Sequence, residues 1–344
     1  MAGLTSLLLA LCVPAVCLAA QPPATAKKST VEDGTKEASA PEKATKEQGT
    51  TEKASEIQFV RLRKDEGKEP VALETAITRY VPADGDPKGL HVDLVGAIHV
   101  GEKDYYEKLN EVFADYDGVL YELVAPEGTK IPRGGRKSSG GSAITYLQQM
   151  LKNTLALEFQ LEHVDYTKGN MIHADMTPAE FSASMKKRGE SFFKMFFKMM
   201  GQAMAMQSKN PNSMNDAQLL VALLSRDRAF KLKRLMAVQM QDVEMHLALL
   251  YGPDGSTIIT ERNKKALEVL DREIKNGKKK LAIFYGAGHL PDFETRLKKD
   301  FGLKRDSQRW LEAWKLTRDA QEPDKKDEAR EADAEPKDAV QSGA

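Results

Sequence analysis

The hydrophobic positions of this chain fall into strand-like runs near both ends of a central region, with helical spacing between them. Alternating or continuous apolar runs predict strands over 57–62, 71–81, 91–98, 118–124, 280–285 and 309–316. Helical spacing predicts helices over 102–116, 260–275 and 291–300, and over most of the stretch from 142 to 250. This order predicts an α/β domain, in which helices flank a central β-sheet and a long, mostly helical insertion occupies about 142–250.

The two ends of the chain lack the pattern of a folded domain. An apolar run that ends in Ala19-Ala20 predicts a signal peptide over 1–20, with a short uncleaved membrane tether as the alternative. Residues 21–56 are rich in Pro, Ala, Thr, Lys and Glu, and residues 321–344 are acidic and Ala-rich, so both predict disordered segments. We therefore expect a secreted or periplasmic protein with one folded domain over 57–320 and no stable membrane span in the mature chain.

Charge and cysteine content narrow the possible chemistry. The 51 basic and 51 acidic residues balance to a formal net charge of zero, which argues against nucleic acid as a partner. Cys12 and Cys17 are the two cysteines of the chain, and both lie in the expected signal peptide. The mature protein would then have no disulfide, thiolate ligand or cysteine nucleophile. Any metal would be held by His, Asp, Glu or backbone oxygens.

Two copies of a short pattern, Gly-x-x-His, each follow a predicted strand. They are Gly96-Ala97-Ile98-His99 and Gly286-Ala287-Gly288-His289. Functional groups of open α/β sheets gather beyond the carboxyl ends of the strands, and a glycine there lets the backbone of residue 96 or 286 approach a bound ligand closely. Imidazole can serve as a metal ligand or a general base. A single copy is more typical of a hydrogen-bonded loop, but two copies in matching contexts indicate a shared site.

Glu122 interrupts the otherwise apolar strand predicted over 118–124. A buried, unpaired carboxylate is costly, so Glu122 requires a cation, a metal or a proton, and a buried Glu–Arg pair is the structural alternative to a functional site. Arg262 is the candidate partner, at the start of a helix for which Thr260 can provide the cap and Glu261 the first turn. Its guanidinium could clamp a carboxylate or a developing oxyanion, and a surface Arg is the simpler alternative.

These motifs together resemble the TraB/PrgY/GumN family, which includes the Tiki proteases. The similar positions are Gly96–His99, Glu122 within Tyr-Glu-Leu, Glu261-Arg262-Asn263 and Gly286–His289, within a region from about 91 to 316. Erythromycin esterases and the haem-binding ChaN proteins belong to the wider superfamily, and the resemblance implies their kind of α/β fold. For Tiki-like members it implies proteolysis that depends on a divalent metal.

Carried over by residue, the resemblance implies that His99, Glu122 and His289 hold the metal and that Arg262 assists. We therefore expect a metal-dependent hydrolase that acts on a peptide or protein, in which the metal polarises the scissile carbonyl and activates a water. Such a ligand set suits zinc, manganese, cobalt or iron. Two alternatives stay open: a metal-independent esterase that uses a histidine as general base, and a non-catalytic protein that binds haem or a peptide signal.

The remaining histidines allow other interpretations. His173 and Asp175 precede a helix that Thr177 or Asp175 could cap, and both could instead reach the site. His163 and His246 lie in helical segments and suggest packing or surface roles, while a sixth histidine, His91, begins a strand.

Residues 192–206 are dense in Phe and Met, and Lys194 and Lys198 share one face of the predicted helix. This amphipathic helix suits core packing, a lid, a substrate groove or a homo-oligomer contact.

Overall fold

The computed structural model describes residues 58–135, 155, 157–191, 194, 201, 216–241 and 255–318. The predicted signal peptide, linker and acidic tail lie outside the described residues, as do His246 and most of the Phe/Met-rich helix. No helix in the described ranges is long and apolar enough to cross a membrane.

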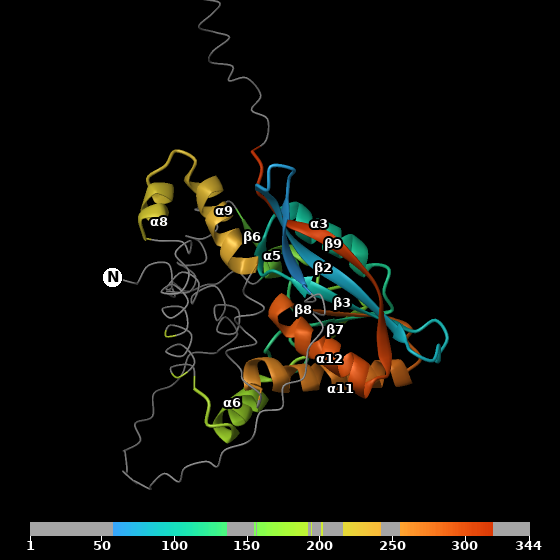
Figure 1. The fold of residues 1–344 in the computed structure, drawn as a ribbon. Helices are drawn as coiled ribbons and strands as arrows, with labels where there is room; N and C mark the ends of the chain where they lie inside the picture. The colour runs from blue at the N-terminus through green and yellow to red at the C-terminus, as the bar shows by residue number, and fades with distance from the viewer. Residues whose placement is uncertain are drawn as a thin grey trace, which may run out of the picture.

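A mixed seven-stranded sheet forms the centre of the domain (Figure 1), which confirms the predicted α/β class. Its strands are β1 (Val60–Lys64), β2 (Pro70–Pro82), β3 (His91–Ala97), β5 (Gly118–Tyr121), β7 (Met171–His173), β8 (Lys280–Gly286) and β9 (Leu303–Lys315). The order is β1-β2-β3-β8-β5-β7, and β9 pairs with β2. Strands β3, β8, β5 and β7 run parallel to one another, whereas β2 is antiparallel to β1, β3 and β9.

Strand β9 is longer than the sequence predicts. It begins at Leu303 rather than at 309, because it follows β2 along the whole of one edge, from Pro82 opposite Leu303 to Ala72 opposite Lys315. Strands β1 and β3 share the other edge of β2 in succession. The first part of β9, after Leu303, is polar and exposed or half-exposed, so it lacks the apolar alternation by which a strand is predicted.

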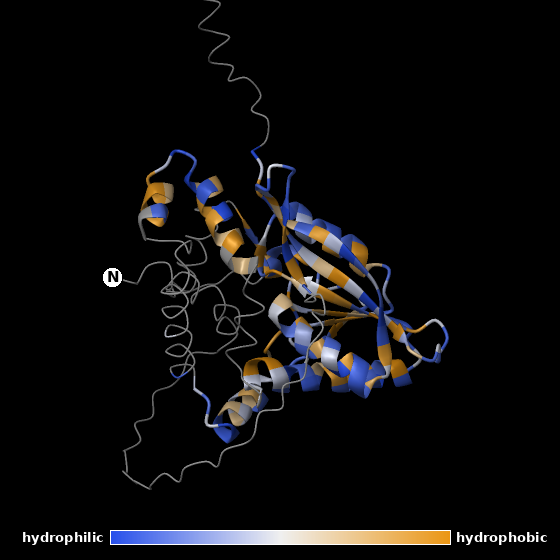
Figure 2. Cartoon of the chain, viewed as in Figure 1, coloured by the Kyte–Doolittle hydropathy of each residue, from blue (hydrophilic) through white to orange (hydrophobic). Residues whose placement is uncertain are grey.

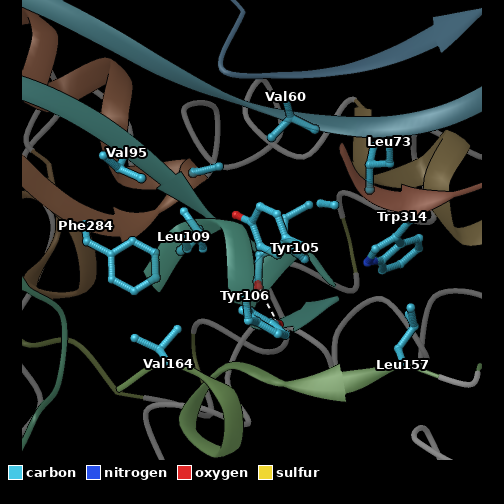
Figure 3. Close-up of a cluster of buried hydrophobic side chains, with 14 of the residues drawn as sticks. Val60, Leu73, Val95, Tyr105, Tyr106, Leu109, Leu157, Val164, Phe284 and Trp314 are labelled. Carbon is cyan, nitrogen blue, oxygen red and sulfur yellow. Dashed lines mark hydrogen bonds between the residues drawn. The ribbon is translucent and has the colours of Figure 1, made fainter. Parts of the chain in front are cut away.

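Helices cover both faces of the sheet. On one face, α3 (Lys103–Phe113) buries Tyr105, Tyr106 and Leu109 against side chains of the central strands, as Figure 3 shows for Val95 and Phe284. On the other face, α11 (Arg262–Lys275) and α12 (Leu290–Asp300) pack on the same strands. Each fully buried Leu or Phe contributes about 1.5–3 kcal/mol. Figure 2 shows hydrophobic residues along the middle strands and mixed character on α11 and α12, as expected of helices with one buried face.

The described residues of the predicted insertion form two short strands as well as helices. The elements there are β6 (Glu158–Phe159), α5 (Gln160–His163), β7, α6 (Pro178–Lys187), α8 (Asp216–Leu223) and α9 (Arg228–Gln241). The sequence analysis missed β7, a strand of the main sheet that pairs in parallel with β5. Strand β6 pairs instead with the short β4 (Val100–Gly101). The predicted cap of α6 is confirmed, since Thr177 forms a capping box with Glu180 and Pro178 occupies the first turn.

Candidate functional site

Four loops meet at one edge of the sheet, because the carboxyl ends of β3, β8, β5 and β7 all point the same way. His99 follows β3, His289 follows β8, Glu122 follows β5 and Asp175 follows β7. Glu122 lies directly after its strand, which ends at Tyr121 and not at 124 as predicted. Since β8 lies between β3 and β5, its last residue lies between the His99 loop and Glu122.

Gly286, the last residue of β8, is where the predicted site residues come together. A Cβ atom placed on Gly286 would lie 3.2 Å from Glu122 Oε2, 3.3 Å from His99 Nε2 and 3.8 Å from His289 Cδ2. Three side chains from three separate loops therefore lie close to the Cβ position of this one residue. A glycine leaves this space open, as a close approach of backbone to a ligand requires.

The two Gly-x-x-His motifs are not equivalent in space. Along the β3–β8 pair, Ala97 and not Gly96 is opposite Gly286, so the two glycines face opposite sides of the sheet. A Cβ on Gly96 would meet Leu290 Cδ1 at 3.2 Å and the Ala76 carbonyl at 3.4 Å, both in the core. The structure thus brings Gly286 and both histidines to the site, whereas Gly96 faces away from it.

Glu122 accepts a hydrogen bond on each carboxylate oxygen. The Gly286 amide donates to Oε2 at 2.7 Å and Arg262 Nη2 donates to Oε1 at 2.8 Å. Arg262 also donates from Nε to Asp175 Oδ1 at 2.9 Å and from Nη2 to Asp175 Oδ2 at 2.5 Å. The structure therefore contains the buried Glu–Arg pair that the sequence allowed, and Arg262, 2 % exposed, is not a surface residue. Two carboxylates and one guanidinium leave this cluster with a formal charge of −1.

A change of helix type sets the position of Arg262. A π-helical turn, η1 (Thr257–Glu261), precedes α11, and Arg262 is the first residue after it. Ser256 caps this turn by accepting from the Ile259 amide at 3.1 Å. The predicted cap residue, Thr260, instead accepts from the Ser256 amide, so that prediction was wrong. Single π turns occur often at functional sites.

Each site histidine has its Nδ1 atom against a side-chain amide. His289 Nδ1 lies 2.6 Å from Asn263 Oδ1, and His99 Nδ1 lies 2.9 Å from Gln160 Oε1. The Nε2 atoms face inward: that of His289 is 3.6 Å from Glu122 Oε1, and that of His99 lies near Gly286. Tying one ring nitrogen in this way is typical of histidines that use the other nitrogen for a metal or a proton.

Burial and charge set the protonation of the buried pair. Burial favours a raised pKa for Glu122, but the positive charge of Arg262, the two histidines and the Gly286 amide hold its pKa well below the usual range. Burial lowers the pKa of His289 to about 4, although Glu122 opposes that change. At neutral pH the site therefore holds an ionised carboxylate beside a neutral imidazole.

The other described histidines lie away from this cluster. His173 approaches the Leu123 carbonyl at 2.6 Å, so of the pair His173 and Asp175 only the aspartate reaches the site. His91 packs on Tyr116. His163 Nε2 lies 3.1 Å from Glu158 Oε2 and forms, with Glu158 and Glu162, a trio whose ligand atoms all lie within 4.8 Å of one another. Among the described residues, this trio alone has the spacing for a metal as it stands.

Sequence reasoning missed or undervalued three residues of the site. Asp175 has a side chain with no exposed surface and binds Arg262 across 87 positions of sequence. Gln160 is buried and lies in the stretch from 142 to 250, for which the spacing predicts mostly helix. Asn263 belongs to the Glu261-Arg262-Asn263 motif, but the sequence indicates no contact with His289. A polar residue two positions after a strand was the available signal for Asp175, but β7 itself was not predicted.

No family model, curated protein or solved structure matches the chain. The assignment of these residues to one site therefore rests on their geometry.

Proposed function

We propose that this protein is a metal-dependent hydrolase of the TraB/GumN/Tiki type, which cleaves a peptide or protein outside the cytoplasm. The observation that carries the proposal is the convergence of His99, Glu122 and His289 on Gly286 at the carboxyl edge of the parallel strands. The resemblance of the same positions to that family supports it further, as does the α/β fold with a central mixed sheet flanked by helices. Zinc, manganese, cobalt and iron all suit this donor set.

The donor set fits a divalent cation in chemistry and charge. His99 and His289 each present Nε2 inward, and Glu122 adds an ionised oxygen donor. The formal charge of −1 over Glu122, Asp175 and Arg262 would attract a cation, with Asp175 offsetting the guanidinium beside the carboxylate. The three ligands are farther apart than the Glu158 trio, so a metal would have to draw the imidazoles closer together.

The residues of the chain have separate roles in this proposal. A metal bound by the three ligands would supply Lewis acidity toward a carbonyl and a water molecule. Arg262 and the Gly286 amide hold Glu122 in place and keep it ionised. Arg262 acts here by positioning the carboxylate, since its Nη2 and Nε atoms already donate to Glu122 and Asp175. The neutral His289 ring can also accept a proton at Nε2.

The decisive experiment measures metal content and metal-dependent cleavage in the same protein. Purified full-length chain would be titrated with Zn²⁺, Mn²⁺ and Co²⁺, and incubated with a diverse peptide library with and without chelator. We expect about one metal per chain, and peptide cleavage that chelation removes and added metal restores. The His99→Ala and His289→Ala variants should lose both binding and cleavage.

His163→Ala is the matched control, because His163 belongs to the one cluster of described residues that has the spacing for a metal as it stands. The proposal predicts that this variant keeps metal and activity. If His163→Ala loses the metal while His99→Ala and His289→Ala keep it, the metal binds at the Glu158 trio and the proposed function is wrong. Wild-type protein that binds no divalent metal would refute it equally.

One observation favours a metal-independent esterase as the second candidate. Both oxygens of Glu122 already accept hydrogen bonds, from Gly286 and Arg262, which leaves fewer lone pairs for a metal. In that case a neutral histidine would act as general base on an ester. Hydrolysis of simple esters that is unchanged by chelator but lost in His289→Ala would favour this candidate.

A further inference from the structure

One amide residue holds each site histidine at two points. Asn263 Nδ2 donates to the His289 carbonyl at 3.0 Å, while its Oδ1 lies 2.6 Å from His289 Nδ1. The Gln160 backbone amide donates to the His99 carbonyl at 3.0 Å, while its Oε1 lies 2.9 Å from His99 Nδ1. Gln160 and Asn263 each therefore hold both the main chain and the ring of one histidine.

The direction of the Asn263 amide follows from its other partner. Asn263 Nδ2 also donates to Asp292 Oδ2 at 2.8 Å, and an ionised carboxylate can only accept. The amide nitrogen is thus committed to Asp292 and to the His289 carbonyl, and the oxygen faces the ring. A carbonyl oxygen only accepts, so His289 Nδ1 must carry the hydrogen. In the neutral ring Nε2 then has the lone pair, on the side of Glu122.

Gln160 is arranged in a parallel way from a different part of the chain. Its Nε2 donates to the Tyr166 hydroxyl at 2.7 Å, which leaves its oxygen for His99 Nδ1. Gln160 is 4 % exposed and begins α5, directly after β6. Strand β6 pairs with Val100 and Gly101, the two residues that follow His99, so this segment is attached to the histidine loop by backbone as well.

We propose that Gln160 and Asn263 are matched positioning residues, which hold His99 and His289 as Nδ1–H tautomers. The Nε2 lone pair of His99 then lies on the side of Gly286, and that of His289 on the side of Glu122. Each amide fixes the tautomer and the plane of its ring, so the orientation of both rings is set before any ligand binds. The importance of this arrangement for catalysis rests on the proposed function. The assignment of the two tautomers does not, because it follows from the hydrogen bonds alone.

The test is ¹⁵N NMR of histidine-labelled, metal-free full-length protein, in which His99→Ala and His289→Ala identify the two rings. We expect both neutral rings to carry the hydrogen on Nδ1. Finding it on Nε2 of either ring overturns the proposal, and this measurement needs no amide variant to fold. Because no metal is present, the result is independent of whether the proposed function is correct.

Variants then test the role of each amide. Gln160→Leu should release the His99 tautomer and weaken Zn²⁺ binding about 10–100-fold, as is usual on loss of a hydrogen bond behind a ligand. Gln160→Glu keeps an oxygen acceptor for His99 Nδ1, so this variant should have the wild-type His99 tautomer and Zn²⁺ affinity. Asn170→Leu is the control, because Asn170 donates to the Phe113 and Tyr116 carbonyls and touches neither site histidine. An unchanged His99 tautomer in Gln160→Leu would contradict the assignment.

Discussion

Replacing Gly286 by alanine adds one methyl group at the centre of the proposed site. The backbone there has φ −48° and ψ 135°, which alanine adopts without strain. The added carbon would lie 3.2 Å from Glu122 Oε2 and 3.3 Å from His99 Nε2, so both must move by a few tenths of an ångström. Overpacking of this kind costs about 1–3 kcal/mol, and the lower entropy of the unfolded chain offsets about 0.4–1 kcal/mol of it.

The effect on binding should be much larger than the effect on folding. Zinc ligands lie about 2.0–2.2 Å from the ion, so a methyl group between His99 and Glu122 takes the space that the imidazoles would close around. We expect Gly286→Ala to weaken Zn²⁺ binding at least about 100-fold, or about 2.7 kcal/mol, with a small change in urea unfolding. Calorimetric titration and equilibrium unfolding measure the two quantities on the same preparation.

Gly96→Ala provides the matched control. Gly96 begins the other Gly-x-x-His motif, but its added methyl group would meet Leu290 and Ala76 in the core. This variant should lose stability by a similar 1–3 kcal/mol and keep Zn²⁺ affinity. If Gly286→Ala binds Zn²⁺ as the wild type does, or if both variants lose it equally, the assignment of the site to Gly286 is refuted.

Three further predictions concern buried charged and polar groups around the site. Asp175→Asn leaves Arg262 with one of its two carboxylates and should cost about 1.5–3 kcal/mol in urea unfolding, the range for hydrogen bonds to a charged group; an unchanged free energy of unfolding would contradict the buried Arg262–Asp175 pair. His289 has a pKa lowered to about 4 from 6.5, so the folded state binds fewer protons than the unfolded state between those values, and the metal-free protein should lose about 3 kcal/mol as pH falls from 6.5 to 4. His289→Gln should flatten this dependence of stability on pH. If the variant loses stability as steeply as the wild type, His289 is not the group responsible. Tyr285→Phe removes the donor to the Ala174 carbonyl and should cost about 1–3 kcal/mol in thermal unfolding, which an unchanged melting temperature would exclude.

The sequence was sufficient to find the residues that follow continuous apolar runs. His99, His289 and Glu122 all come after runs whose side chains are buried on both faces, and such runs stand out from helical spacing. The same reasoning gave both interpretations of Glu122 but could not choose between them. The Arg pair depends on the depth of Arg262, which follows a π turn that no local pattern reveals.

The missed features depend on contacts between distant parts of the chain. Strand β7 has three residues, Met171–His173, too few to show an alternation, and its pairing with β5 alone defines it as a strand. Asp175 could not be assigned to the site without that strand. Gln160 looked like any polar residue in a helical stretch, because its partner His99 is 61 positions away.

The strand order has a consequence for the protein during its synthesis. Strand β8 comes from the last quarter of the described chain, yet it lies between β3 and β5, which are made much earlier. A nascent chain that ends before residue 280 has no strand between the His99 loop and Glu122, and it lacks Gly286 and His289 as well. Whatever reaction this site performs, an incomplete chain cannot perform it, so the order of the strands delays activity until nearly the whole domain exists.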